Sequence, residues 1–307
     1  MPDIQSKTPK FTYEDVLNML STVHSLIDGT AQIYNKYNND EPISDSLADQ
    51  ERRNFPNKEL ITDVHYRGIL SMESAADHFM VFADSIAEPA KTIAPWTCVR
   101  GLLETCAIAV WFLDPTIDAK TRVERCFAFR YAGFIEQIKF FHVKKMQAEI
   151  DKAQQRIIKV ENDAVLLGYP RLLDKNGNIN GIALHMPSII ELIGTTLDRE
   201  ADYRLLSGIA HGHHWAISQI GFRVNDIENS EGQRIKFLEK HLDPIFVLYA
   251  AEIAVTSFAK VLWDLWRLYG WDLKEIEQFL DQTYGQLHYR TEFRFWHSTS
   301  SALEKHL

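Results

Sequence analysis

The stretch from Trp96 to Leu113 limits most strongly the folds open to this chain. It is apolar on almost every side, and Arg100 and Glu104 are its only charged residues. A helix that is apolar all round has to be covered by other elements. We therefore predict a central, buried helix here.

Apolar residues recur at helical spacing along most of the remaining chain, whereas the alternation typical of strands does not extend over a useful length. We therefore predict an all-α bundle of roughly seven to nine helices. The longest runs from near Asp118 to Leu167, with a charged second half that projects into solvent or packs on a partner. The other expected helices cover residues 12–38, 60–87, 187–197, 198–220, 244–269 and 272–284.

Polar, glycine-rich and proline-rich segments divide these helices. We expect a disordered lead-in at 1–10 and a single all-helical domain at 11–307, with loops near 39–58, 168–184 and 223–240. Asn176-Gly177 suggests a small hairpin-like turn inside the second loop.

Composition places the chain among ordinary globular proteins. The net charge of −9 argues against a surface that binds nucleic acid all over, although a local basic patch remains compatible with it. Cys98, Cys106 and Cys126 are an odd number in apolar surroundings, which fits reduced thiols in a cytoplasmic protein.

The most membrane-like run is Ile245 to Trp266. Glu252, Lys260 and Asp264 interrupt it, and such charges are costly at the centre of a bilayer. We predict a buried core helix and no membrane partner.

The segment from Asp198 to Ile220 carries the strongest chemical signal. Read as one helix, it places a polar stripe opposite an apolar one. His213 falls toward the apolar side, where a core histidine is the simplest interpretation. The polar stripe holds Arg204, Ser207, His211, His214, Trp215 and Ser218.

An arginine, six further residues and a histidine, Arg204 to His211, resemble the signature of the HEPN (higher eukaryotes and prokaryotes nucleotide-binding) helical domains. The segments 100–104, 111–115 and 203–211 are also similar to uncharacterised bacterial helical proteins of unknown function. The first resemblance implies a homodimer that binds or cleaves RNA or nucleotides without a metal, in a toxin or defence setting. It implies catalytic roles for Arg204 and His211, with His214 as a second proton carrier or a substrate contact.

The residue types suit this chemistry. An imidazole can take a proton from a ribose hydroxyl, and a guanidinium can bind a phosphate bidentately. The alternative is a non-enzymatic interaction or ligand-binding module in which the arginine and histidine bond internally.

Glu104 is the expected internal carboxylate. It lies four residues after Arg100 in an apolar helix, and buried charges persist when they are paired. An Arg100–Glu104 pair is the simpler interpretation; the functional one is that Glu104 orients Arg204 or His211. Arg100, Glu104, Ser207 and Tyr203 thus form the predicted support of the Arg–His pair.

A metal site is the less favoured use of His211, His213 and His214. His213 diverges from the other two on a helix, and the Glu-x-x-His pairs of di-iron bundles are absent from the sequence. A site would need Glu73, Asp77 or His78 from another helix, so we predict no metal and no cofactor.

Two other patterns have plain structural interpretations. Basic residues between Lys145 and Lys159 alternate with acidic ones, as on a solvated face. The aromatic run from Phe127 to Phe141 is expected in the core or in a dimer interface.

Overall fold

The computed structural model describes residues 41–87, 91–220, 222–228, 234–240, 244–274 and 276–278, together with Ser21, Ser25, Gly29 and Gln32. Those four isolated positions are helical. The remainder of the helix predicted at 12–38, the lead-in at 1–10 and the C-terminal stretch from 279 lie outside the described residues.

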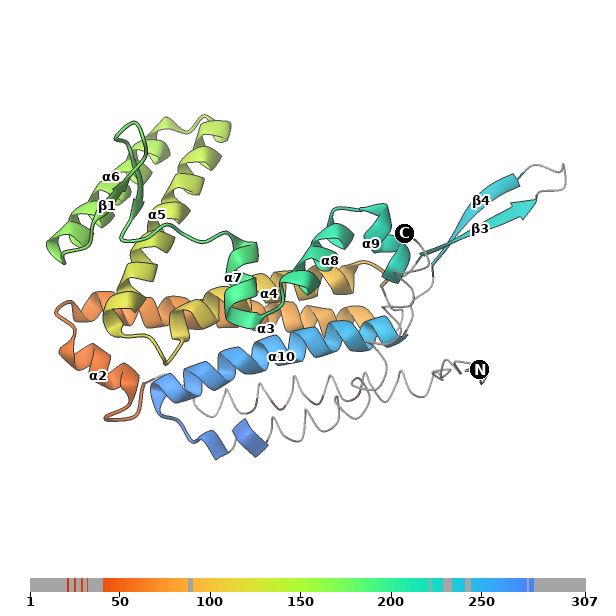
Figure 1. The fold of residues 1–307 in the computed structure, drawn as a ribbon, viewed down its shortest axis with the longest axis horizontal. Coiled ribbons are helices and arrows are strands. Elements are labelled where there is room, and N and C mark those ends of the chain that lie inside the picture. The colour runs from red at the N-terminus through yellow and green to blue at the C-terminus, as the bar shows by residue number, and fades with distance from the viewer. Residues whose placement is uncertain are drawn as a thin grey trace, which may run out of the picture.

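The described chain is an all-α bundle, as predicted (Figure 1). Two short antiparallel hairpins are its only strands within the described ranges. The elements are α2 (Leu47–Asn54), α3 (Lys58–Ile86), α4 (Ala94–Leu113), α5 (Ala119–Lys144), α6 (Gln147–Leu166), β1 (Arg171–Leu173), β2 (Ile179–Ile182), α7 (Ile189–Leu197), α8 (Glu200–Ala210), α9 (His214–Ile220), β3 (Phe222–Glu228), β4 (Arg234–Lys240) and α10 (Pro244–Tyr269).

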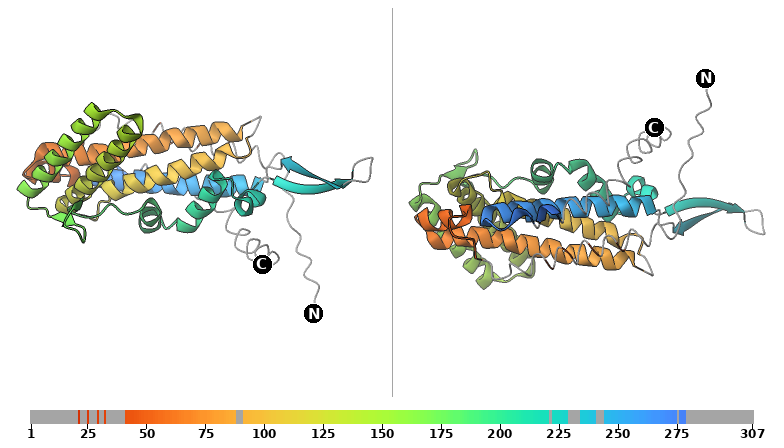
Figure 2. Two further views of the ribbon diagram at one scale, coloured as in Figure 1. Left: turned by 90° about the horizontal axis from the view of Figure 1, so that it is seen from above. Right: turned by 90° about the horizontal axis from the view of Figure 1, so that it is seen from below.

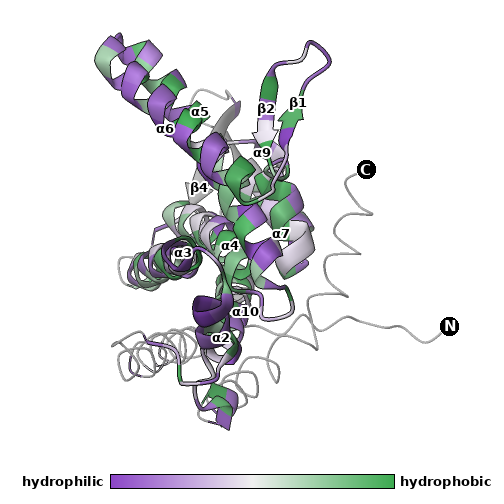
Figure 3. Cartoon of the chain, turned by 90° about the vertical axis from the view of Figure 1, so that its left-hand side faces the viewer, coloured by the Kyte–Doolittle hydropathy of each residue, from purple (hydrophilic) through white to green (hydrophobic). Residues whose placement is uncertain are grey.

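Helix α4 is the centre of the bundle. It packs against α3 and α10 along its length and is covered elsewhere by α5, α7 and α8. Figure 3 shows α4 as a largely hydrophobic helix between α3 and α7. Among the described helices, α4 alone is long and apolar enough to cross a membrane by length and composition, and most of it is buried here in protein. The prediction of a buried central helix is confirmed.

Close packing against α4 depends on two glycines. A Cβ on Gly68 would lie 2.5 Å from Cγ of Leu113, and one on Gly101 would lie 2.6 Å from Cε1 of His78. Both distances are too short for a carbon contact, so these positions let α3 and α4 approach.

The predicted long helix from Asp118 to Leu167 is wrong as a single element. The chain reverses at Lys145, which has φ 57°, and α6 packs back along α5. Helices α5 and α6 thus form a hairpin that leans away from the bundle (Figures 1 and 3). No proline or glycine stands at this reversal, so the sequence lacks the usual break signal.

Two of the three predicted loops contain more regular structure than we predicted, which was at most a short turn of helix within 39–58. Residues 39–58 include α2, which Ser46 caps by accepting a hydrogen bond from the backbone N–H of Asp49. Residues 223–240 contribute most of the β3–β4 hairpin, which extends beyond the end of the bundle in both views of Figure 2. The segment 168–184 forms the β1–β2 hairpin around the expected turn at Gly177, whose φ is 82°.

Candidate functional site

The predicted helix from Asp198 to Ile220 is two helices. Helix α8 ends at Ala210, His211 is its C-cap, and Gly212 follows with φ 72°. The N–H of His213 donates to the carbonyl of Gly208 at 2.9 Å, and that of Gly212 donates to the carbonyl of Ile209 at 3.0 Å. This is the Schellman arrangement, which requires a left-handed residue where Gly212 stands.

The break changes which side chains share a face. The single stripe predicted across Arg204 to Ser218 does not continue past His211, because α9 starts in a new direction after the left-handed turn. His213, predicted in the core, is exposed, as are His211 and His214. The ring centroids of His211 and His213 lie 6.2 Å apart. The chain turn is therefore a histidine-rich corner open to solvent.

Arg204 lies on the exposed side of α8, about two helical turns before His211. Its Nη2 lies 2.7 Å from Oε1 of Glu200, and its Nε donates to the same oxygen at 3.0 Å. The side chains of Arg204 and Glu200 are 63% and 52% exposed, so this is a surface ion pair. The carboxylate that holds Arg204 is thus Glu200, and not Glu104 as we had considered.

Glu104 takes part in a different cluster, where α4 meets α8. Its Oε1 lies 3.0 Å from Nε of Arg100 and accepts a hydrogen bond of 3.0 Å from the hydroxyl of Tyr203. Arg100 also places its guanidinium 5.5 Å from the centroid of the Tyr203 ring. The predicted Arg100–Glu104 pair is present, and its partner on α8 is Tyr203.

Burial raises the pKa of the Tyr203 hydroxyl, and the hydrogen bond to Glu104 raises it further against the opposing effect of Arg100. Tyr203 therefore remains a protonated donor at neutral pH. The cluster fixes α8 on α4, with Ser207 half-buried one turn further along. It holds the helix that carries Arg204 without touching the Arg204 side chain.

We use the name corner face for five exposed residues on α8, at the turn that follows it and at the start of α9, although they do not form one helical stripe: Arg204, His211, His213, His214 and Trp215. Trp215 is 52% exposed, yet its ring also packs over Gly208, where a Cβ would lie 2.7 Å from Cζ2. An indole that packs against the protein with one face and exposes the other can present a flat surface to a ligand. Buried Ala216 and Ile220 anchor α9 beneath it.

A second polar network, which we did not predict, joins the start of α8 to α10. Arg199 donates to Oδ2 of Asp202 at 3.2 Å, to Oε1 of Glu252 at 2.5 Å and to Oγ1 of Thr256 at 3.0 Å. The hydroxyl of Tyr249 donates to Asp202. In the sequence, Glu252 is a charge that interrupts an apolar run, and this interruption is the one local signal of the network.

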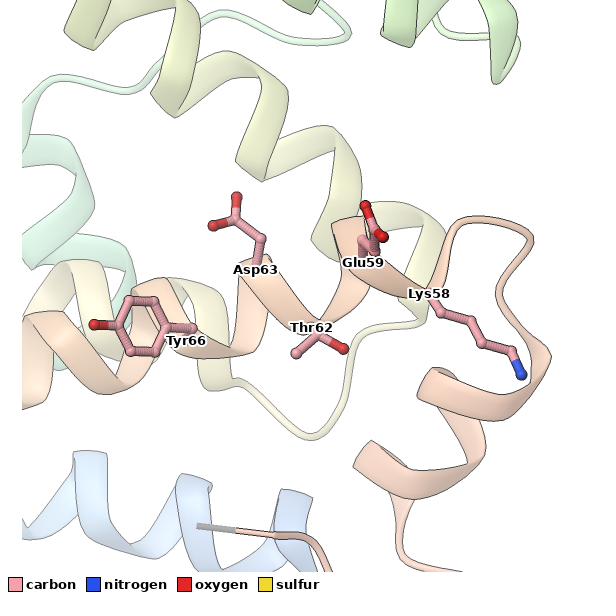
Figure 4. A pocket seen from close by; sticks show the side chains of 5 residues that line it. All are labelled: Lys58, Glu59, Thr62, Asp63 and Tyr66. Carbon is pink, nitrogen blue, oxygen red and sulfur yellow. The ribbon is translucent and has the colours of Figure 1, made fainter.

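A shallow hollow lies on the first turns of α3, away from all the predicted site residues. Its lining comes from one helix, and Figure 4 shows Asp63 and Glu59 pointing to one side, with Lys58 extending toward α2. Asp63 is already paired with Arg67 at 2.9 Å. The lining residues are Lys58, Glu59, Thr62, Asp63 and Tyr66.

In the described part of the chain, no three His, Cys, Asp or Glu side chains lie close enough together to hold a metal ion. The cysteines are unsuited to reactive roles, since burial raises the pKa of Cys126 to about 11 and that of Cys106 still higher.

No family model, no curated protein and no solved structure matches this chain. The resemblance to HEPN domains therefore stays an expectation based on Arg204 and His211.

Proposed function

We propose that this chain is an HEPN-like helical protein that binds or cleaves RNA or nucleotides through its corner face. The observation that carries the proposal is the shared exposure of Arg204, His211 and His214 beside a half-exposed Trp215. These groups supply a phosphate ligand, proton carriers and a stacking surface.

The ion pair between Arg204 and Glu200 does not prevent phosphate binding. Exposed pairs of this kind contribute about 0–1 kcal/mol, so a phosphate group can displace the carboxylate from the guanidinium. The pair holds the guanidinium at the surface until a ligand arrives. His211 and His214 then act on the ribose hydroxyl and the leaving oxygen.

A single copy presents this chemistry on an open surface, whereas phosphodiester cleavage needs groups on both sides of the reacting phosphate. We propose that two copies in a cytoplasmic homodimer bring their corner faces together. Trp215 would stack on an unpaired base, as aromatic side chains do in proteins that bind single strands.

The test is an RNA cleavage and binding assay on wild type, Arg204→Ala and His211→Ala, with and without EDTA. We expect metal-independent cleavage that both substitutions abolish while circular dichroism shows folded protein. Glu200→Gln is the matched control, because it removes the ion pair and keeps the guanidinium, and its affinity for RNA should be equal or higher. Absence of RNA cleavage and binding in the wild type would rule out the proposal.

The alternative is a non-enzymatic interaction module, and one observation favours it. The half-buried carboxylates Glu104, Asp202 and Glu252 all have partners inside the protein, as expected of scaffolding. In that case Arg204→Ala and His211→Ala would change partner binding and leave no RNA activity to lose.

A further inference from the structure

The last turn of α5 and the two residues that lead into α6 form a short segment with an unusual composition. Residues 140–146 read Phe-Phe-His-Val-Lys-Lys-Met and contain no acidic residue, in a chain whose net charge is −9. We call this segment the hairpin tip. It lies at the end of the α5–α6 hairpin that is far from the bundle (Figures 1 and 3).

The hairpin tip exposes several apolar side chains at once. Phe140, Val143 and Met146 are 55%, 82% and 45% exposed. Single exposed apolar residues are common, but a group on one projecting end marks an interaction surface. Lys144 and Lys145 stand among them and are also exposed.

Local structure does not explain these residue types. Lys145 adopts φ 57° at the end of α5, where glycine is favoured. Met146 precedes α6 as its N-cap without a side-chain hydrogen bond, where Ser, Thr, Asp or Asn is favoured. Residues that break local preferences are expected where a side chain serves function.

The contacts at the hairpin tip favour lipid over RNA as the partner. The ammonium of Lys144 lies 6.0 Å from the centroid of the Phe140 ring, and Phe141 packs against the same ring at 5.5 Å. Phe140 is therefore poorly placed to stack on a base. The most exposed apolar side chain is aliphatic Val143, and the hairpin tip has no arginine.

We propose that the hairpin tip docks on the surface of an anionic lipid bilayer. Phe140, Val143 and Met146 enter the headgroup region, while Lys144 and Lys145 bind lipid phosphates and carboxylates from stems that lie along the apolar surface. The charge is complementary there although the protein as a whole is acidic. This peripheral binding needs no spanning helix, and it departs from our prediction of no membrane partner, which rested on the charges that interrupt the run from Ile245 to Trp266.

The test is co-sedimentation of the full chain with vesicles of phosphatidylcholine alone and of phosphatidylcholine mixed with phosphatidylserine. We expect binding to the anionic vesicles only, weakened by added salt because the charges are exposed. Lys144→Gln combined with Lys145→Asn should lower the partition coefficient about twenty-fivefold, which is fivefold for each lysine. Val143→Ser should lower it about tenfold.

Two variants on the same hairpin provide matched controls. Ile158 is an exposed apolar residue of α6 outside the hairpin tip, and Lys152 is an exposed lysine of α6 paired with Glu149. Ile158→Ser and Lys152→Gln should bind vesicles as wild type does. All five altered side chains are exposed, so the proteins should remain folded.

Three results would overturn the proposal. They are absence of sedimentation with anionic vesicles, equal loss in the control variants, and loss of RNA binding in the tip variants with vesicle binding unchanged. The hairpin tip would instead be a contact between copies if the wild type does not bind vesicles and the Val143→Ser variant is monomeric while the wild type is not.

Discussion

Glu51 and Arg122, 71 residues apart in sequence, form an ion pair in the interior, with Nε of Arg122 3.1 Å from Oε2 of Glu51. Nε2 of His65 lies 2.7 Å from the same oxygen. Arg122 also donates to the carbonyls of Phe112 and Asp114, where α4 ends. The three charged or polar groups connect α2, α3 and α5 to the end of the central helix.

Removal of the Glu51 carboxylate should destabilise the protein strongly. Arg122 and His65 are fully buried, and Glu51 is 12% exposed. Glu51→Ala leaves a buried guanidinium without its counter-charge, so we expect a loss of about 3–5 kcal/mol in the free energy of unfolding, measured in urea. Glu41→Ala is the control, because Glu41 pairs with Arg52 while 83% exposed, and should cost less than about 1 kcal/mol. Equal losses in both variants would contradict the assignment.

The same cluster should make stability fall in acid. Burial lowers the pKa of His65, more than its hydrogen bond to Glu51 raises it. Burial raises the pKa of Glu51, but His65 and Arg122 together lower it below its usual value. As pH falls, the unfolded chain therefore takes up protons that the folded protein does not, first at His65 at about pH 6.5 and then at Glu51 at about pH 4.3.

We accordingly expect the free energy of unfolding to be constant between about pH 7 and pH 8, and to decrease as pH falls through about 6.5 and again through about 4.3. Urea titrations followed by circular dichroism at several pH values measure it. His65→Gln should remove the first decrease, and His211→Gln, which alters an exposed histidine, should keep it. Identical profiles for wild type and His65→Gln would exclude His65 as the cause.

Tyr203→Phe should loosen the attachment of α8 to α4. It removes the hydroxyl that donates to Glu104 at 3.0 Å and accepts from Arg100 at 3.3 Å, and leaves the ring beneath the guanidinium. We expect a loss of about 1–2 kcal/mol in thermal or urea unfolding. Under the proposed function the affinity for RNA should fall less than with Arg204→Ala, since Tyr203 does not touch the ligand.

Gly212→Ala tests the corner between α8 and α9. Because Gly212 has φ 72°, an alanine there is strained, and we expect about 1 kcal/mol of destabilisation. Gly133→Ala is the comparison, because Gly133 lies within α5 with nothing within 4 Å of an added Cβ. It should stabilise the protein by about 0.5–1 kcal/mol. Opposite signs in the two variants are the expected outcome, and equal signs would refute the conformational argument.

Local patterns in the sequence predicted much of this fold correctly. Apolar spacing indicated α3, α4, α7 and α10, and the order Arg100, Glu104 indicated an ion pair one helical turn apart. These features depend on neighbours within a few residues, which periodicity and capping describe. Gly212 was also a readable break signal, although we read a continuous helix through it.

Three other features depend on contacts between distant parts of the chain, and only the tertiary structure reveals them. The pairing of Glu51 with Arg122 joins residues far apart in sequence, so no local pattern points to it. The reversal at Lys145 exists because α6 gains contacts along α5, which offset the strain of a lysine in the left-handed region. The corner face likewise depends on where α8 is held by Tyr203 on α4. Local sequence patterns thus indicate most of the helical segments, whereas burial in three dimensions sets which charges meet and where the helices turn.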